Sequence, residues 1–212
     1  YCDHPHPIVR SAALRLLALT QSRELLPRIA QALQDPAHPV RTAAAEALAC
    51  FGQTGAEAAV QLPPDTGLQT ADAALEAVIL SRSAGAADLM LGLIEPKCRF
   101  AADCLNRQQA LNQLSDQKNR PALVMLEAFA RQLLNQIIQI LHALGNRKAA
   151  VALKTALLSN DSRQCAGAIE LLESMRSHRC VSWALRLLYP LTGTVYSKQD
   201  TPQKIDARDI LE

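Results

Sequence analysis

The segment Cys2–Pro7 contains the first side chains in the sequence that could bind a metal ion, because His4 and His6 stand close to Cys2 and Asp3. Imidazole, thiolate and carboxylate groups are the ordinary ligands of zinc in proteins. However, a proline follows each histidine, which excludes the i, i+4 helical spacing that would aim both at one ion. No second group of ligands follows in the sequence. We therefore interpret the segment as a proline-rich entry to a helix and predict no metal site and no cofactor.

The six cysteines are scattered along the chain and form no C-x-x-C motif. They are Cys2, Cys50, Cys98, Cys104, Cys165 and Cys180. Most of them stand among Ala and Leu, in stretches typical of helices. A chain of this length with so few cysteines does not need a disulfide framework. The pattern favours free thiols in a reducing compartment over zinc or redox sites.

Motifs of catalysis and phosphate binding are absent from the sequence. It contains no P-loop, no G-x-G-x-x-G, no H-E-x-x-H and no G-x-S-x-G. His142 and His178 could act as bases only if the fold brought a nucleophile to them. We predict that the protein is not an enzyme, and this prediction depends on missing motifs.

Arg10 and Arg41 are charged residues that recur at a fixed spacing of 31 positions. Each follows a proline and a valine at the start of a predicted helix. One interpretation is structural, in which each arginine ties one repeat's loop to the next through carbonyl groups or an aspartate. The other is functional, in which they contact an anion or an acidic peptide. We favour the structural interpretation and retain both arginines as repeat-defining or interaction residues.

The arginines belong to a longer repeat. Residues 6–17 and 38–48 share a proline, then Val-Arg, then Ser or Thr, then small residues followed by leucines at helical spacing. Weaker copies occur at 68–78 and 161–172, and an amphipathic helix is predicted over 24–34 between the first two. Asp or Pro opens each predicted helix by capping free N–H groups or by suiting its first turn. Helix, turn, helix and Asp-Pro turn make one unit of a solenoid.

Composition supports helices packed on helices. Hydrophobic residues make up 49% of the 212 residues, but aromatic residues only 3%, so the apolar mass is mostly Ala and Leu. The formal net charge is +2 without a basic block, which argues against nucleic acid as a partner. No run of 18 apolar residues exists, so no membrane span is predicted in this segment.

The repeat resembles the HEAT-like repeats of the phycobilisome-lyase type, which share a similar period and an Asp-x-x-x-Val-Arg-x-x-Ala-Ala core. The resemblance is good over residues 3–51 and 161–176 and poor over 52–67. It implies an all-α fold, an α-α superhelix of antiparallel helix pairs. It also leaves open a role as a bilin lyase or a lyase-helper subunit.

We predict one HEAT-like repeat domain over residues 1–212, with regular repeats at 3–62, irregular ones at 68–144 and regular ones at 146–192. A helix break is predicted at Glu95-Pro96 and a terminal helix from about Pro202. The chain has no initiator Met, which suggests a fragment of a larger protein. Whether Leu211-Glu212 is native or derived from a tag stays open.

Residues after 120 have a second resemblance, to the HEAT segment of bacterial nucleotide-transporter-like membrane proteins. The core Ala168-Ile169-Glu170-Leu171-Leu172-Glu173 and the closing Tyr189-Pro190-Leu191 carry it. It implies that the chain is the module on the cytoplasmic side of such a protein, associated with the membrane only through a parent transmembrane domain.

The predicted function is a non-catalytic scaffold in the cytoplasm. Its partner would be another protein or other domains of the parent chain. A solenoid offers a long surface for such contacts and brings no reactive chemistry of its own. The alternatives are the bilin lyase and a solenoid that binds nucleic acid, for which a continuous basic groove would be required.

Overall fold

A computed structural model describes residues 1–63, 66–112, 120–159 and 161–192 of the chain. Within these ranges the chain forms α-helices and two short 3₁₀ helices, with no β-strand. The elements are α1 (Pro7–Thr20), η1 (Arg23–Leu25), α2 (Leu26–Gln31), η2 (Ala32–Gln34), α3 (His38–Ala49), α4 (Gln53–Val60), α5 (Leu68–Ser81), α6 (Ala86–Asn112), α7 (Arg120–Ala143), α8 (Arg147–Leu158), α9 (Ser162–Ser174) and α10 (Arg179–Thr192).

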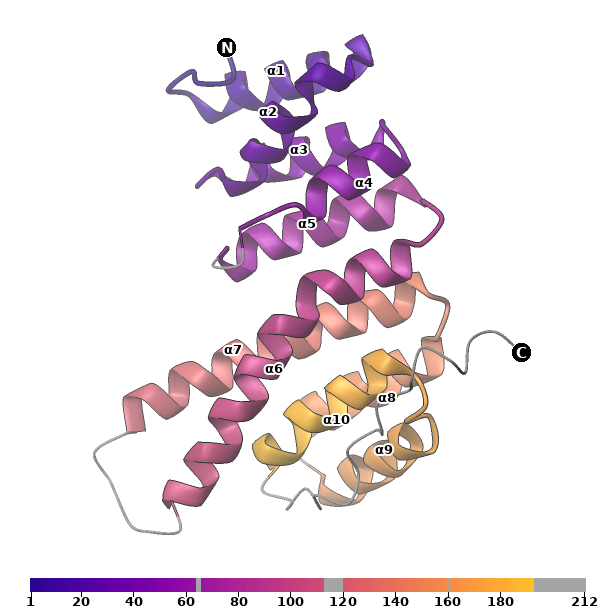
Figure 1. Cartoon of the computed structure of the whole chain (residues 1–212). Coiled ribbons are helices and arrows are strands. Elements are labelled where there is room, and N and C mark those ends of the chain that lie inside the picture. The colour runs from indigo at the N-terminus through magenta and orange to yellow at the C-terminus, as the bar shows by residue number, and fades with distance from the viewer. Residues whose placement is uncertain (64–65, 113–119, 160, 193–212) are drawn as a thin grey trace, which may run out of the picture.

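The helices stack in chain order as an α-solenoid (Figure 1). Helix α1 packs on α3 and α3 packs on α5, while α2 contacts α4 and α4 contacts α6. Each repeat therefore touches mainly its neighbours, as expected for a solenoid. The predicted all-α superhelical fold is confirmed.

Local sequence explains where several helices begin and end. Pro7 and Pro39 lie in the first turns of α1 and α3, where a missing N–H costs nothing. Gly145, with a φ of 77°, follows the last turn of α7 in the left-handed region that favours glycine. Asn146 then caps α8 by accepting a hydrogen bond from the Ala149 amide at 3.3 Å, and Asp161 caps α9 in the same way.

Small residues let the first helices approach closely. Ala43, Ala44 and Ala45 of α3 are fully buried between neighbouring helices. Gly55 of α4 is also buried, and a Cβ atom built there would lie 1.9 Å from the Leu48 carbonyl oxygen of α3. The alanine-rich composition is thus used for close helix packing.

The predicted break at Glu95-Pro96 is wrong, because α6 continues through Pro96. Figure 1 shows α6 bending part-way along its length, as proline-containing helices do. A proline inside a helix costs about 3 kcal/mol. Ile94, Cys98 and Leu105 stand on both sides of Pro96, and all three are buried. Burial of this continuous apolar stripe offsets the cost of the proline.

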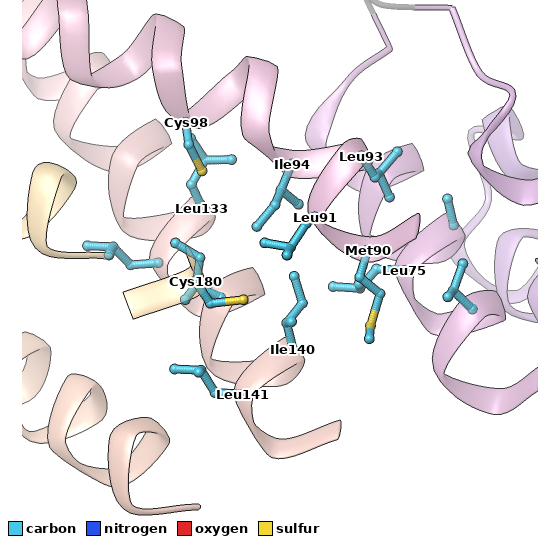
Figure 2. Close-up of a cluster of buried hydrophobic side chains, with 14 of the residues drawn as sticks. Leu75, Met90, Leu91, Leu93, Ile94, Cys98, Leu133, Ile140, Leu141 and Cys180 are labelled. Carbon is cyan, nitrogen blue, oxygen red and sulfur yellow. The ribbon is translucent and has the colours of Figure 1, made fainter. Parts of the chain in front are cut away.

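Helix α10 returns across the C-terminal half and packs on α6 and α7, besides its chain neighbour α9 (Figure 1). Cys98 of α6 and Cys180 of α10 both lie in the buried cluster drawn in Figure 2, together with Leu133 and Ile140 of α7. At the edge of this contact Arg179 of α10 donates a 2.7 Å hydrogen bond to Glu95 of α6. The C-terminal helices therefore close on α6 as well as following it.

We expect the two buried thiols to resist alkylation in the folded protein. Burial raises the pKa of Cys98 to about 12, helped by the nearby Cys180, and raises the pKa of Cys180 to about 11. Because the thiolate is the nucleophile, few of these groups ionise at pH 8. Iodoacetamide at that pH, followed by peptide mass spectrometry, should modify the exposed Cys50 at least about a hundredfold faster than either buried thiol.

Denaturant supplies the control, since all the cysteines should then react at similar rates. Equal rates for Cys50 and Cys98 in the native protein would contradict the closed contact between α6 and α10.

Some predictions fall outside the described residues. These are the terminal helix from about Pro202, the status of Leu211-Glu212, and parts of the loops at 64–65 and 113–119. The boundaries of the three repeat regions stay a prediction. Among the described helices, none combines the length and the apolar character that crossing a bilayer requires.

Candidate interaction surface

The Arg10 guanidinium connects the two ends of the first repeat. Its Nε and Nη2 atoms donate to the two Asp35 carboxylate oxygens at 2.8 and 2.9 Å. Its Nη1 atom donates to the carbonyl oxygens of His4 and Pro5 at 2.8 and 2.9 Å. Only about a seventh of each charged side chain is exposed, 14% for Arg10 and 13% for Asp35. A bidentate pair of this kind fixes both distance and orientation.

Arg41 repeats half of this arrangement one unit later. Its Nη1 atom donates to the carbonyl oxygens of Asp35 and Pro36 at 2.8 and 2.9 Å. Asp35 therefore lies between two successive arginines, with its carboxylate bound to Arg10 and its backbone bound to Arg41. These contacts are of the type that the structural interpretation of the arginines requires. That the two residues define the repeat stays a prediction.

His4 occupies the position 31 residues before Asp35 and takes over part of its role. The His4 Nδ1 atom accepts a hydrogen bond from the His6 amide at 3.1 Å, just as Asp35 accepts one from the Ala37 amide at 2.9 Å. His4 is thus a turn-forming residue before α1. Among the described residues no cluster of three or more His, Cys, Asp or Glu side chains is placed to hold a metal ion.

The electrostatics of Asp35 follow from these contacts. Partial burial raises its pKa, but the hydrogen bonds from Arg10 and Ala37 and the charges of Arg10 and Arg41 lower it more. The net effect holds the Asp35 pKa below its ordinary value, so the carboxylate stays charged at neutral pH.

A polar groove crosses α3, α5 and α7 beside this tie, with a volume of about 610 Å³. We call it the polar groove. Its lining residues are His38, Arg41, Thr42, Gln69, Asp72, Ala73, Glu76 and Gln139. Because successive repeats each contribute side chains to it, the groove exists only in the stacked solenoid.

Asp72 is held in place by two amides from α7. Gln136 Nε2 donates to its Oδ1 atom at 2.6 Å, and Gln132 Nε2 donates to its Oδ2 atom at 3.2 Å. Gln136 is only 1% exposed, and its Oε1 atom has no hydrogen-bond partner. Amides orient the carboxylate but do not neutralise it, so Asp72 keeps a full negative charge in the groove.

Glu76 stands one helical turn after Asp72 on α5. Burial raises its pKa, the charge of Glu46 raises it further, and His38 lowers it. In the described part of the chain neither Asp72 nor Glu76 forms an ion pair, whereas Glu46 pairs with Arg15 at 3.2 Å. The groove therefore contains two carboxylates without a cation bound to them.

The remaining candidate bases do not meet a nucleophile. His142 lies on the exposed side of α7, and His178 lies in the turn before α10. Neither side chain forms a hydrogen bond to a serine or cysteine among the described residues. The geometry offers charged and polar contacts rather than a catalytic group.

Known families can now be compared with these repeats. Residues 1–62 match the sequence model of the HEAT repeats. This range covers α1 to α4 and includes Arg10, Asp35 and Arg41. No curated protein and no solved structure matches the chain significantly. Together with the helical stacking, the match supports a HEAT-like repeat protein, and HEAT repeats are commonly protein-interaction scaffolds.

Sequence reasoning identified the arginines but not the acidic side of the groove. Asp35 could have been found from the Asp-Pro turn that precedes the second copy of the repeat. Asp72 and Glu76 gave no signal, because they are two acidic residues on one helix among many. Their role depends on α7, whose Gln136 lies 64 residues further along the chain.

Proposed function

We propose that the protein is a non-catalytic interaction scaffold that binds a basic segment of another protein in the polar groove. The observation that carries this proposal is the pair of carboxylates, Asp72 and Glu76, without a bound cation in a groove of about 610 Å³. The HEAT repeats over residues 1–62 support the scaffold role. A lysine or arginine of the partner would neutralise the carboxylates and accept the charge-assisted hydrogen bonds' geometry that Asp72 already has.

The groove chemistry does not favour the other functions. A phosphate backbone would meet two carboxylates here, and only Arg41 lines the same groove with a full positive charge. No feature of the described residues favours a bilin lyase. We therefore propose a polypeptide partner, either a separate protein or another domain of the parent chain.

A narrower version makes the chain a module on the cytoplasmic side of a transporter-like membrane protein. The likeness of the core at Ala168–Glu173 and of Tyr189–Leu191 supports it. This version requires apolar segments of about 20 residues elsewhere in the same polypeptide. A complete reading frame without such segments would contradict it, but would leave the groove proposal unaffected.

The groove is tested by charge reversal at Glu76. A random peptide library displayed on phage is selected against the wild-type chain, and the enriched peptides are measured by fluorescence anisotropy. We expect them to contain Lys or Arg and to lose at least tenfold in affinity for Glu76→Lys, with a smaller loss for Glu76→Gln. Tenfold corresponds to about 1.4 kcal/mol, a modest value for one charge pair at an interface.

Glu170→Lys is the matched control, since Glu170 is exposed on α9 and does not line the groove. It makes the same change in net charge and should leave the affinity unchanged. Peptides that are acidic, that bind Glu76→Lys as tightly as wild type, or that respond equally to both reversals would contradict the proposal.

A further inference from the structure

The outward side of α1 is an apolar surface at the N-terminal end of the solenoid. We call it the α1 outer face, made of Val9, Ala12, Ala13, Leu16 and Leu17. It borders a depression of about 480 Å³ with no charged side chain in its lining. Leu16 is 64% exposed on this face. A repeat that ends a solenoid ordinarily presents a polar outer face, and α1 does not.

The 31-residue register shows what the equivalent faces do inside the solenoid. Each residue of the α1 outer face has a counterpart 31 positions later in α3 and 62 positions later in α5. For Val9, Ala12, Ala13 and Leu16 these are Val40, Ala43, Ala44 and Ala47 in α3, and Ala71, Ala74, Leu75 and Val78 in α5. All eight counterparts are at most 1% exposed.

The helix before each of them packs against these helices, because α1 contacts α3 and α3 contacts α5. The same register also holds for hydrogen bonds, since Arg10 and Arg41 bind carbonyl oxygens of equivalent residues. The α1 outer face therefore has the composition and the position of a surface that a preceding helix covers in the next two repeats.

We propose that the α1 outer face is the docking surface for a further helix of the same repeat type, supplied by the polypeptide that precedes Tyr1. The inference depends on the chemistry of α1 and on its register with α3 and α5. The incoming helix would present small or branched apolar residues to Leu16. It would lack the carboxylate tie of the first repeat, because His4 stands where Asp35 stands one unit later.

Leu19 provides an internal control for this surface. It lies three residues after Leu16 and is 78% exposed, but its counterpart in α3 is Cys50, which is itself exposed. A stacked helix should therefore cover position 16 and leave position 19 open. Apolar side chains at both positions make the comparison independent of residue type.

The experiment compares Leu16→Cys and Leu19→Cys in the polypeptide that includes the native residues upstream of Tyr1. Each variant is alkylated with iodoacetamide, and the modified site is read by peptide mass spectrometry, so that native cysteines do not interfere. We expect Leu16→Cys to react at least tenfold more slowly than Leu19→Cys in this longer polypeptide. In the chain of residues 1–212 the two rates should be similar.

Three results would overturn the proposal. Equal rates at the two positions in the longer polypeptide would show that nothing covers the α1 outer face. Protection of Leu16→Cys that disappears on dilution would assign the face to a second copy of the chain. A reading frame with no helix-forming residues upstream of Tyr1 would remove the proposed occupant.

Discussion

Gly55→Ala should destabilise the protein by about 3 kcal/mol, as much as a severe core substitution. The added methyl group would lie 1.9 Å from the Leu48 carbonyl oxygen and 2.8 Å from its carbonyl carbon. Both are backbone atoms of α3, so no side chain can rotate away to make room. Either α4 must move away from α3 or the last turn of α3 must open, and buried apolar contacts are lost in both cases. Urea unfolding followed by circular dichroism would measure the change.

Gly167→Ala is the matched control for this substitution. Gly167 lies within α9, is exposed, and would place its new Cβ atom in open space. Alanine is a better helix former than glycine, so this variant should gain about 0.5–1 kcal/mol. The two substitutions make the same chemical change with opposite expected signs. A Gly55→Ala variant as stable as wild type would show that α3 and α4 are further apart than the structure places them.

The first repeats could be predicted from sequence because their signals are local. A proline at the helix start, an arginine after it and a run of small residues all lie within about a dozen positions, and they recur in copies 31 residues apart. Helix starts and stops such as Gly145 and Asn146 are equally local, since each needs only its own turn. These features predicted the fold class and the interpretation of Arg10 and Arg41.

The rest depended on contacts between distant residues. Pro96 ends a helix by local rules, and only the packing of α6 on α7 and α10 shows why the helix continues. Arg179 meets Glu95 across 84 residues of sequence, and Gln136 orients Asp72 across 64. No periodicity connects such pairs, so the polar groove was not foreseen. Sequence patterns located the repeat, whereas the irregular central helices determined its most charged surface.

Asp35→Ala is the substitution that should most weaken the connection between the first two repeats. It removes the acceptor of two Arg10 hydrogen bonds and of the Ala37 amide. Hydrogen bonds to charged groups contribute about 1.5–3 kcal/mol when made, so we expect a loss of about 2 kcal/mol at pH 7. Asp161→Ala is the control, because Asp161 caps α9 through the Arg163 amide and lies on the exposed surface. Loss of a cap alone should cost about 1 kcal/mol.

The pH dependence separates the ion pair at Asp35 from a simple cap. The folded-state pKa of Asp35 is lowered, so its contribution to stability is fully present above the unfolded-state pKa of about 3.9. This contribution declines as the pH falls through the lowered folded-state value, where the carboxylate takes up a proton. The difference in unfolding free energy between wild type and Asp35→Asn should therefore be constant from pH 7 to about pH 5 and shrink toward pH 3. Asparagine retains an oxygen that can accept from the Ala37 amide, so this difference reports mainly the charge. A difference that stays constant down to pH 3 would mean that the Arg10–Asp35 pair does not stabilise the junction, and that the repeats are joined by their apolar contacts alone.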